Sequence, residues 1–245
     1  MPDDRDALIA EALGQGWYHT IDLAPGVATP GAVDLRAVAP RVLPPRLDGL
    51  RALDVGTFDG FWAFALEARG ATVVASDLDR FDEVEWPPQN RDRLAAEAGD
   101  RGPGERFALA RRLLGSQARR VTANVYDLDA ALLGGPVDHA VVGDLLLHLR
   151  DPVGALERVR SVLSPGGRLL VLEQIDVPLT LLCPRRPVAT FRAGATRMSW
   201  WEANVRGLVD WLRVAGFRGA RIRRIYRLRA AGPQARWHVA VEARA

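Results

Sequence analysis

The 245-residue chain contains no lysine, and all 33 of its basic residues are arginine. A mechanism that uses a lysine Schiff base is therefore excluded. The single cysteine, Cys183, excludes an internal disulfide and any cysteine-rich metal site. The His, Asp and Glu residues match no metal-ligand spacing, and no Ser-His-Asp or Cys-His arrangement stands out. We therefore expect no bound metal and no nucleophile of the hydrolase type.

Long apolar runs are also missing. Residues 1–13 are acidic, so we expect neither a signal peptide nor a membrane anchor, and hence a cytoplasmic protein. The net charge is only +3, and arginines alternate with acids, which favours a solvated surface over a nucleic-acid footprint. The stretch RIRRIYRLR at 221–229 is richer in arginine than the rest of the chain, so tRNA remains an alternative partner. The sequence carries no signal for an oligomeric state.

Composition and periodicity predict one globular α/β domain, because 48% of the residues are hydrophobic and 26% are charged. Short apolar runs alternate with helical patterns from about residue 51, which indicates a mostly parallel sheet covered by helices on both faces. A final antiparallel hairpin is expected around Gly232-Pro233, pairing 219–229 with 235–243. The other strands are expected near 51–56, 72–77, 120–125, 138–143 and 168–173.

Three helices have clear end signals. The first follows Gly60 and ends at Gly70. The second is capped by Asp151, with proline as its first residue. The third is expected to begin with a capping box, Ser199 to Glu202.

The remaining segments suggest a division into a lid and a catalytic domain. Residues 1–50 are expected to form an N-terminal lid, and 51–245 the domain that binds a cofactor. The insertions 81–118 and 175–199 fall where an α/β sheet places caps over the carboxyl ends of its strands.

The strongest chemical signal is LDVGTFDG at 53–60, where an apolar strand runs into a glycine turn and then a helix. Gly56 and Gly60 let the backbone approach a ligand closely. The dinucleotide motif G-x-G-x-x-G is absent, which disfavours a pyrophosphate. Asp54 can instead pair with an ammonium group, and Asp77, which ends the next strand, can bind ribose hydroxyls. Together these residues favour S-adenosylmethionine (SAM) over NAD.

These motifs resemble those of class I SAM-dependent methyltransferases. The similarity lies in LDVGTFDGFWAFALEARGATVVASDLD and in DPVGALERVRSVLSPGGRLLVLE. It implies a Rossmann-like fold with a seven-stranded, mostly parallel sheet and a terminal antiparallel hairpin, with SAM as cofactor. Phe58 stands where many members carry glycine. The cofactor-binding residues implied are Asp54, Gly56, Thr57, Gly60, Asp77, Leu78, Tyr126, Asp127, Gly143, Asp144 and Leu145.

Within that superfamily, 16–31, 145–152 and WWEANVRGLVDWLRVAGF resemble the wobble-uridine tRNA methyltransferase branch. Some members of that branch use carboxy-SAM, with a tyrosine where this chain has Leu147, so SAM itself is expected here. We expect a small-molecule O, N or C acceptor first and a tRNA nucleoside second. Two further readings stay open: another displacement at the sulfonium, such as SAM cyclisation, and binding of SAM without catalysis.

Methyl transfer from a sulfonium needs a base only when the acceptor must lose a proton. His148, after the fourth strand, is the leading candidate; the alternative is a ring bonded to nearby backbone. His19 in the lid and Glu173 at the end of the fifth strand are further candidates, whereas His139 and His238 are not expected to be catalytic.

Aromatic residues near the expected lids are candidates for acceptor binding, with simple lid packing as the alternative. Two lie beside His19, and two tryptophans are expected to open the last helix together with Asn204. The substrate-binding candidates are Trp17, Tyr18, Trp200, Trp201 and Asn204.

Overall fold

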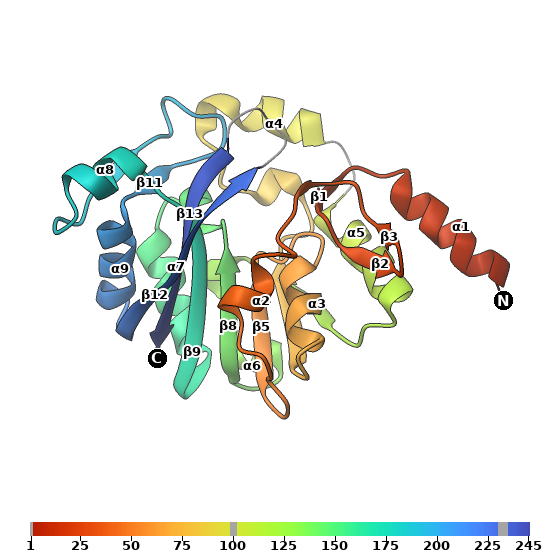
Figure 1. Cartoon of the computed structure of the whole chain (residues 1–245). Coiled ribbons are helices and arrows are strands. Elements are labelled where there is room, and N and C mark those ends of the chain that lie inside the picture. Colours follow the sequence, from red (N-terminus) through yellow and green to blue (C-terminus); the bar gives the residue numbers. More distant parts are fainter. Residues whose placement is uncertain (1, 99–101, 230–234) are drawn as a thin grey trace.

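A computed structural model describes residues 2–98, 102–229 and 235–245. Its centre is a seven-stranded sheet in the order β12-β13-β9-β8-β5-β6-β7 (Figure 1). Strands β7, β6, β5, β8 and β9 run parallel, whereas β13 is antiparallel to both β9 and β12. The predicted Rossmann-like fold with a terminal hairpin is confirmed. The strands span Arg51–Val55 (β5), Thr72–Asp77 (β6), Arg119–Thr122 (β7), Val137–Gly143 (β8), Leu163–Gln174 (β9), Arg218–Arg229 (β12) and Ala235–Arg244 (β13).

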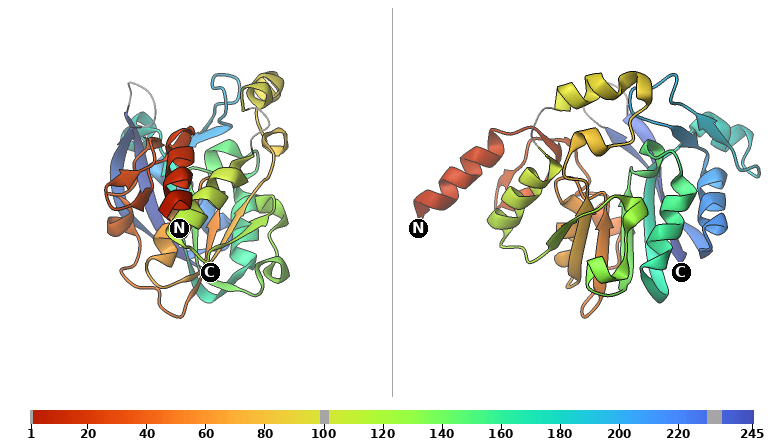
Figure 2. Two further views of the ribbon diagram at one scale, coloured as in Figure 1. Left: turned by 90° about the vertical axis from the view of Figure 1, so that its right-hand side faces the viewer. Right: turned by 180° about the vertical axis from the view of Figure 1, so that it is seen from behind.

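Helices cover both faces of this sheet (Figure 2). On β5, Ala52 packs into one core and its neighbour Leu53 into the other, because successive side chains of a strand point to opposite faces. Burial on both faces explains why the parallel strands are nearly continuous apolar runs. One face carries α3 (Phe61–Glu67) and α5 (Pro103–Leu114), and the other carries α6 (Ala130–Leu133), α7 (Pro152–Ser161) and α9 (Val205–Val214).

The N-terminal segment folds into short elements on the α3 side of the sheet. Strand β1 pairs in parallel with β4, which brings Gly31 opposite Trp17. A Cβ on Gly31 would lie 2.1 Å from the carbonyl carbon of His19, so only glycine allows this approach. The elements are α1 (Pro2–Leu13), β1 (Trp17–His19), β2 (Asp22–Ala24), β3 (Val27–Ala28), β4 (Gly31–Val33) and α2 (Ala39–Val42).

The two insertions meet beyond the upper edge of the sheet in Figure 1. The first contains η1 (Phe81–Glu83), η2 (Pro88–Asn90), α4 (Arg91–Ala98) and α5, and the second contains α8 (Val177–Leu182) and β10 (Ala189–Phe191). The side-chain amide of Asn90 donates to the backbone oxygen of Thr196 at 3.3 Å, and Arg197 forms an ion pair with Glu97. Helix α5 instead packs against α1 and β2, away from that edge.

The predicted start of the last helix is wrong. Residues Trp201–Ala203 form strand β11, which pairs with β10, and α9 begins only at Val205. Asn204 is its cap, because its side-chain oxygen accepts from the Gly207 N–H at 2.7 Å. The Ser199–Glu202 spacing suggested a capping box, but pairing with β10 gives this segment the conformation of a strand.

The other two helix predictions are confirmed at their ends. Asp151 caps α7 by accepting from the Gly154 N–H at 2.8 Å, and Gly70 follows α3 with a positive φ of 92°. The predicted Gly232-Pro233 turn lies outside the described residues.

Candidate functional site

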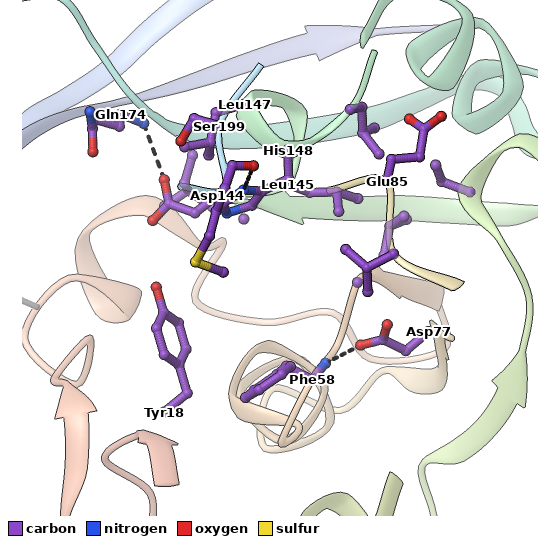
Figure 3. A pocket seen from close by; sticks show the side chains of 18 of the residues that line it. Tyr18, Phe58, Asp77, Glu85, Asp144, Leu145, Leu147, His148, Gln174 and Ser199 are labelled. Carbon is purple, nitrogen blue, oxygen red and sulfur yellow. Dashed lines mark hydrogen bonds between the residues drawn. The ribbon is translucent and has the colours of Figure 1, made fainter. Parts of the chain in front are cut away.

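A cavity of about 680 Å³ lies at the carboxyl ends of the parallel strands (Figure 3). Its lining comes from β1, the loops after β5, β6 and β8, both insertions and the terminal hairpin. Ligands in open α/β sheets bind at this edge, where the strand order reverses next to the first strand.

The glycine loop after β5 forms part of the cavity wall through Gly56. This residue has a φ of 70°, and a Cβ there would lie 3.3 Å from the side chain of Leu145, which also lines the cavity. Gly60 and Thr57 do not line it. A Cβ on Gly60 would lie 2.4 Å from the ring of Phe64, so this glycine serves close packing at the start of α3.

Asp54 lies beneath this loop, and its carboxylate is fully buried. One oxygen accepts from the Thr57 hydroxyl at 2.7 Å and from the Ala63 N–H at 2.9 Å. The other oxygen, Oδ1, has no hydrogen-bond partner among the described residues. Burial raises the pKa of Asp54 to about 7. Asp54 does not itself line the cavity, so a ligand could reach this unpartnered oxygen only from beneath the glycine loop.

Asp77 ends β6 and does line the cavity, together with Leu78. Its carboxylate accepts from the Phe58 N–H at 2.6 Å (Figure 3) and from the Leu78 N–H at 2.7 Å, and these bonds fix its orientation. Burial raises the pKa of this carboxyl from its ordinary value. A carboxylate has lone pairs beyond these two bonds, so Asp77 can still accept from ligand hydroxyls.

The predicted pair Tyr126 and Asp127 lies in the turn η3 (Val125–Asp127) and does not line the cavity. The Tyr126 hydroxyl donates to Glu85 at 3.0 Å and accepts from the Asp151 N–H at 3.2 Å, so it ties the first insertion to α7. Asn124 and Val125 line the cavity in their place. The turn brings these two earlier residues to the cavity wall, and no pattern in the sequence indicates this.

Gly143, Asp144 and Leu145, at the end of β8, all line the cavity. A Cβ on Gly143 would lie 2.7 Å from the indole nitrogen of Trp62, so glycine is required for this contact. Asp144 has a positive φ of 45°, an uncommon conformation for a non-glycine residue. Its Oδ1 accepts from the Gln174 N–H at 3.1 Å.

Of the three predicted catalytic residues, His148 and His19 line the cavity and Glu173 does not. His148, in η4 (Leu146–His148), lies with Nδ1 3.1 Å from the backbone oxygen of Met198, so that nitrogen carries the proton and Nε2 is the free base. Burial lowers the pKa of His148, which keeps the ring neutral. His19 Nδ1 bonds to the buried carboxylate of Asp59.

Glu173 is buried behind the cavity wall. One of its oxygens accepts from the Leu146 N–H at 2.9 Å, and the other has no partner among the described residues. Burial, followed by the charge of Asp144, raises the pKa of Glu173 well above its ordinary value. This shift favours the uncharged form of the carboxyl, which supports the loop that carries His148 through its bond to Leu146.

Of the substrate-binding candidates, Tyr18 and Trp201 line the cavity, whereas Trp17, Trp200 and Asn204 do not. The Trp17 indole donates to the Ala12 oxygen at 2.6 Å within the N-terminal segment, and the Trp200 indole donates to the Glu85 oxygen in the first insertion. The Asn204 amide is fully buried and used as the α9 cap. The side chains of these three residues are therefore structural, because their polar atoms already bond to other parts of the protein.

Several cavity residues were not among the predicted site residues, and four polar ones lie together: Gln174, Tyr226, Arg236 and His238. All lie on β9, β12 or β13, with their side chains on one face of the sheet. The alternation of side chains within 219–229 and 235–243 could have suggested which residues of each strand share a face. Only the pairing register between the strands shows that these residues lie next to one another.

The described residues include no group of three or more His, Cys, Asp or Glu side chains that could hold a metal ion. Nor does any helix in the described ranges have the length and apolar character needed to span a membrane.

Several solved structures share this fold. The N-terminal domain of EvdMO1, crystallised with S-adenosylhomocysteine (SAH) and D-fucose, is 17% identical, with a TM-score of 0.60 over 99% of this chain and 97% of that chain. The 1,6-didemethyltoxoflavin-N1-methyltransferase of Burkholderia thailandensis, with SAH and 1,6-didemethyltoxoflavin bound, is 19% identical, with a TM-score of 0.53 over 80% and 71%. Magnesium protoporphyrin IX methyltransferase from Synechocystis PCC 6803, with SAH, is 16% identical, with a TM-score of 0.50 over 99% and 82%.

At the sequence level, no curated protein matches the chain. A family model described as a methyltransferase domain matches residues 32–221, which is well over half of the chain. The matched segment includes the glycine loop, Asp77 and the end of β8 described above. The protein therefore belongs to the methyltransferase domain family and is a SAM-dependent methyltransferase.

Proposed function

We propose that the protein transfers the methyl group of SAM to an O, N or C atom of a small-molecule acceptor. The observation that carries this proposal is the extent of the cavity, which continues from Gly56 and Asp77 to Tyr226 and His238 on the terminal hairpin. A second molecule can therefore lie beside the cofactor. Cyclisation of SAM, or binding of SAM without catalysis, needs no such space.

The residues at the cofactor end fit SAM. Asp77 offers a fixed carboxylate to ribose hydroxyls, and Gly56 lets the chain approach without a Cβ. Asp54 lies behind the cavity wall, and its unpartnered oxygen suits the ammonium group of an amino-acid ligand reached through water. When bound, SAM supplies an electrophilic methyl group on its sulfonium.

The acceptor end is walled mainly by apolar side chains: Val33, Leu35, Trp62, Leu172 and Leu228. Such walls exclude water and align a flat or apolar molecule, which is the protein's main contribution to an in-line displacement. Two similar structures bear names of enzymes that act on toxoflavin-type and porphyrin molecules, which supports a small-molecule acceptor here.

His148 is the base in this proposal. Its Nδ1–H is held by the Met198 oxygen, so Nε2 is left to accept the acceptor's proton as the new bond to carbon forms. His19 is the second choice, since Asp59 fixes its other ring nitrogen in the same way. Glu173 supports this arrangement from behind the wall.

The test is to incubate the protein with methyl-labelled SAM and either a mixture of small metabolites or total tRNA. We expect SAH to form, with label entering the small-molecule fraction. Methylthioadenosine formed without an acceptor would mean cyclisation, and label in tRNA would mean that the resemblance to the wobble-uridine branch extends to the substrate. Either result would overturn the proposal.

A further inference from the structure

One face of the terminal hairpin contributes a group of hydrogen-bond donors to the acceptor end of the cavity. Tyr226 on β12 lies directly opposite His238 on β13, and Leu228 lies opposite Arg236. All four line the cavity. Because residues two apart on a strand share a face, the register places Tyr226, Arg236 and His238 side by side on it. We call these three residues the hairpin triad.

His238 is held in a doubly protonated form by its two neighbours. Its Nδ1 lies 3.2 Å from the backbone oxygen of Arg236, and its Nε2 lies 3.2 Å from the carboxylate of Asp144. A carbonyl and a carboxylate can only accept, so each ring nitrogen must donate. The side chain is only 7% exposed. This burial acts to lower the pKa of His238, but the hydrogen bond and charge of Asp144 outweigh it and raise the pKa, so the ring and Asp144 form an ion pair in the wall.

The other two members of the triad have donors left over. The Tyr226 ring stacks on His238 with 5.5 Å between centroids, and its hydroxyl has no hydrogen-bond partner within the described ranges. Arg236 is exposed at the cavity wall, and no described carboxylate lies within ion-pairing distance of it.

The charges that face this end of the cavity otherwise cancel. Glu202 pairs with Arg192, Asp144 with His238 and Arg197 with Glu97. Glu173 does not line the cavity, and burial raises the pKa of its carboxyl, which favours the uncharged form. The unpaired acids Asp77, Glu83 and Glu85 line the cavity from the loop after β6, at the cofactor end. Of the three arginines that line the cavity, Arg192 and Arg197 are ion-paired, and Arg236 has no ionic partner among the described residues, so its positive charge is available to a ligand.

We infer that the acceptor is a flat organic acid whose carboxylate binds the hairpin triad, with Arg236 as its main partner and the Tyr226 hydroxyl as a second donor. This inference rests on the proposed function and names the class of its substrate. The apolar walls Leu172 and Leu228 flank the triad and receive the body of the acid. A guanidinium and a phenol on one face of the cavity wall can both donate to a carboxylate, and such charge-assisted hydrogen bonds are about twice as strong as neutral ones.

The carboxylate of SAM itself is the other possible source of this chemistry. The glycine loop follows β5, and β13 and β12 are the third and fourth strands from it in the sheet order. At the usual strand spacing they lie roughly 14 and 19 Å away. The triad is thus on the far side of the cavity from the loop that holds the cofactor, which favours the acceptor's carboxylate.

The experiment uses matched planar aromatic acids and their amides, for example 1-hydroxy-2-naphthoate and 1-hydroxy-2-naphthamide. Binding to the SAH-saturated protein is measured by calorimetry for the parent, Arg236→Gln and Tyr226→Phe. Arg223→Gln is the matched control, since Arg223 is exposed on the same hairpin and does not line the cavity. SAH affinity is measured first for every variant.

We expect the acids to bind about tenfold or more tightly than their amides to the parent and the control. Arg236→Gln should bring acid and amide within about threefold, and Tyr226→Phe should reduce the preference without reversing it. Equal binding of acids and amides to the parent, or no binding of any acid, would overturn the inference. So would an Arg236→Gln variant that loses SAH affinity but keeps its affinity for methylthioadenosine, which lacks a carboxylate, because the triad would then bind the cofactor. A parent that does not bind SAH would instead refute the proposed function.

Discussion

The imidazole of His19 is hydrogen-bonded through Nδ1 to the carboxylate of Asp59, which is completely buried. The second oxygen of the same carboxylate accepts from the backbone N–H of His19 at 2.8 Å and of Tyr18 at 3.1 Å. One aspartate of the glycine loop thus holds both the backbone and a ring of the N-terminal segment. The two cavity-lining residues of β1 depend on this single carboxylate for their position.

Replacing Asp59 with alanine should therefore release the N-terminal segment. The change leaves two backbone N–H groups and the His19 ring without their partner, so we expect the free energy of unfolding to fall by about 3 kcal/mol. Urea unfolding followed by tryptophan fluorescence measures it. Asp48→Ala, which removes an exposed ion pair with Arg46, should change it by less than about 1 kcal/mol. Equal effects in both variants would contradict the role given to Asp59.

Asp77→Ala should weaken SAM binding roughly tenfold to a hundredfold, since ribose hydroxyls would lose a charged acceptor worth about 1–3 kcal/mol. Calorimetry on a variant with unchanged circular dichroism is the measurement. Gly56→Val provides a comparison that acts through backbone crowding, because this residue has a φ of 70° and a Cβ there would lie 3.3 Å from the Leu145 side chain. Unchanged SAM affinity in folded Asp77→Ala would refute the ribose assignment.

Asp54 should make stability depend on pH. Its pKa is about 7 in the folded protein and near 3.8 when exposed, so the folded state binds the extra proton between these values. Stability is then fully present below about pH 4 and falls as pH rises toward 7, by at most about 1.4 kcal/mol per pH unit. Asp54→Asn should reduce this slope, and the contributions of Glu173 and Asp77, whose pKa values burial also raises, should remain. Denaturant unfolding from pH 4 to 8 tests this, and identical slopes in parent and variant would exclude it.

His148→Ala should lower turnover by about 10²–10⁴-fold while leaving SAM affinity nearly unchanged, because base catalysis acts in the transition state. Only the neutral ring accepts a proton, so the parent's rate should fall as pH drops through a pKa below the ordinary histidine value. The rate of the variant should not show this decrease at low pH. A stable variant with turnover within a few-fold of the parent would leave His19 or alignment alone to explain the reaction.

The protein should not bind tRNA specifically. If the arginines of β12 did contact phosphates, binding would weaken steeply and linearly with salt on a logarithmic plot. A filter-binding assay between low and physiological salt should detect no such complex. Specific tRNA binding that is lost over this range would make tRNA the leading acceptor.

By itself the sequence determined the order of the strands along the chain, the glycine loop and the two acids near the ends of β5 and β6. These signals are local: a strand, a turn and a helix start lie within a few residues of one another, so periodicity and glycine positions reveal them. The end of α3 and the cap of α7 are predictable for the same reason.

Only the tertiary structure decided which side chains share the cavity. Trp200 and Asn204 lie close to Trp201 in sequence, yet pairing of β11 with β10 turns only Trp201 inward. Asp144 and His238 are far apart in the chain, and the β9–β13 pairing brings them together. Contacts of this kind depend on strand register and on how the insertions pack over the sheet. Both are set by packing between segments far apart in the chain, so they leave no local pattern in the sequence.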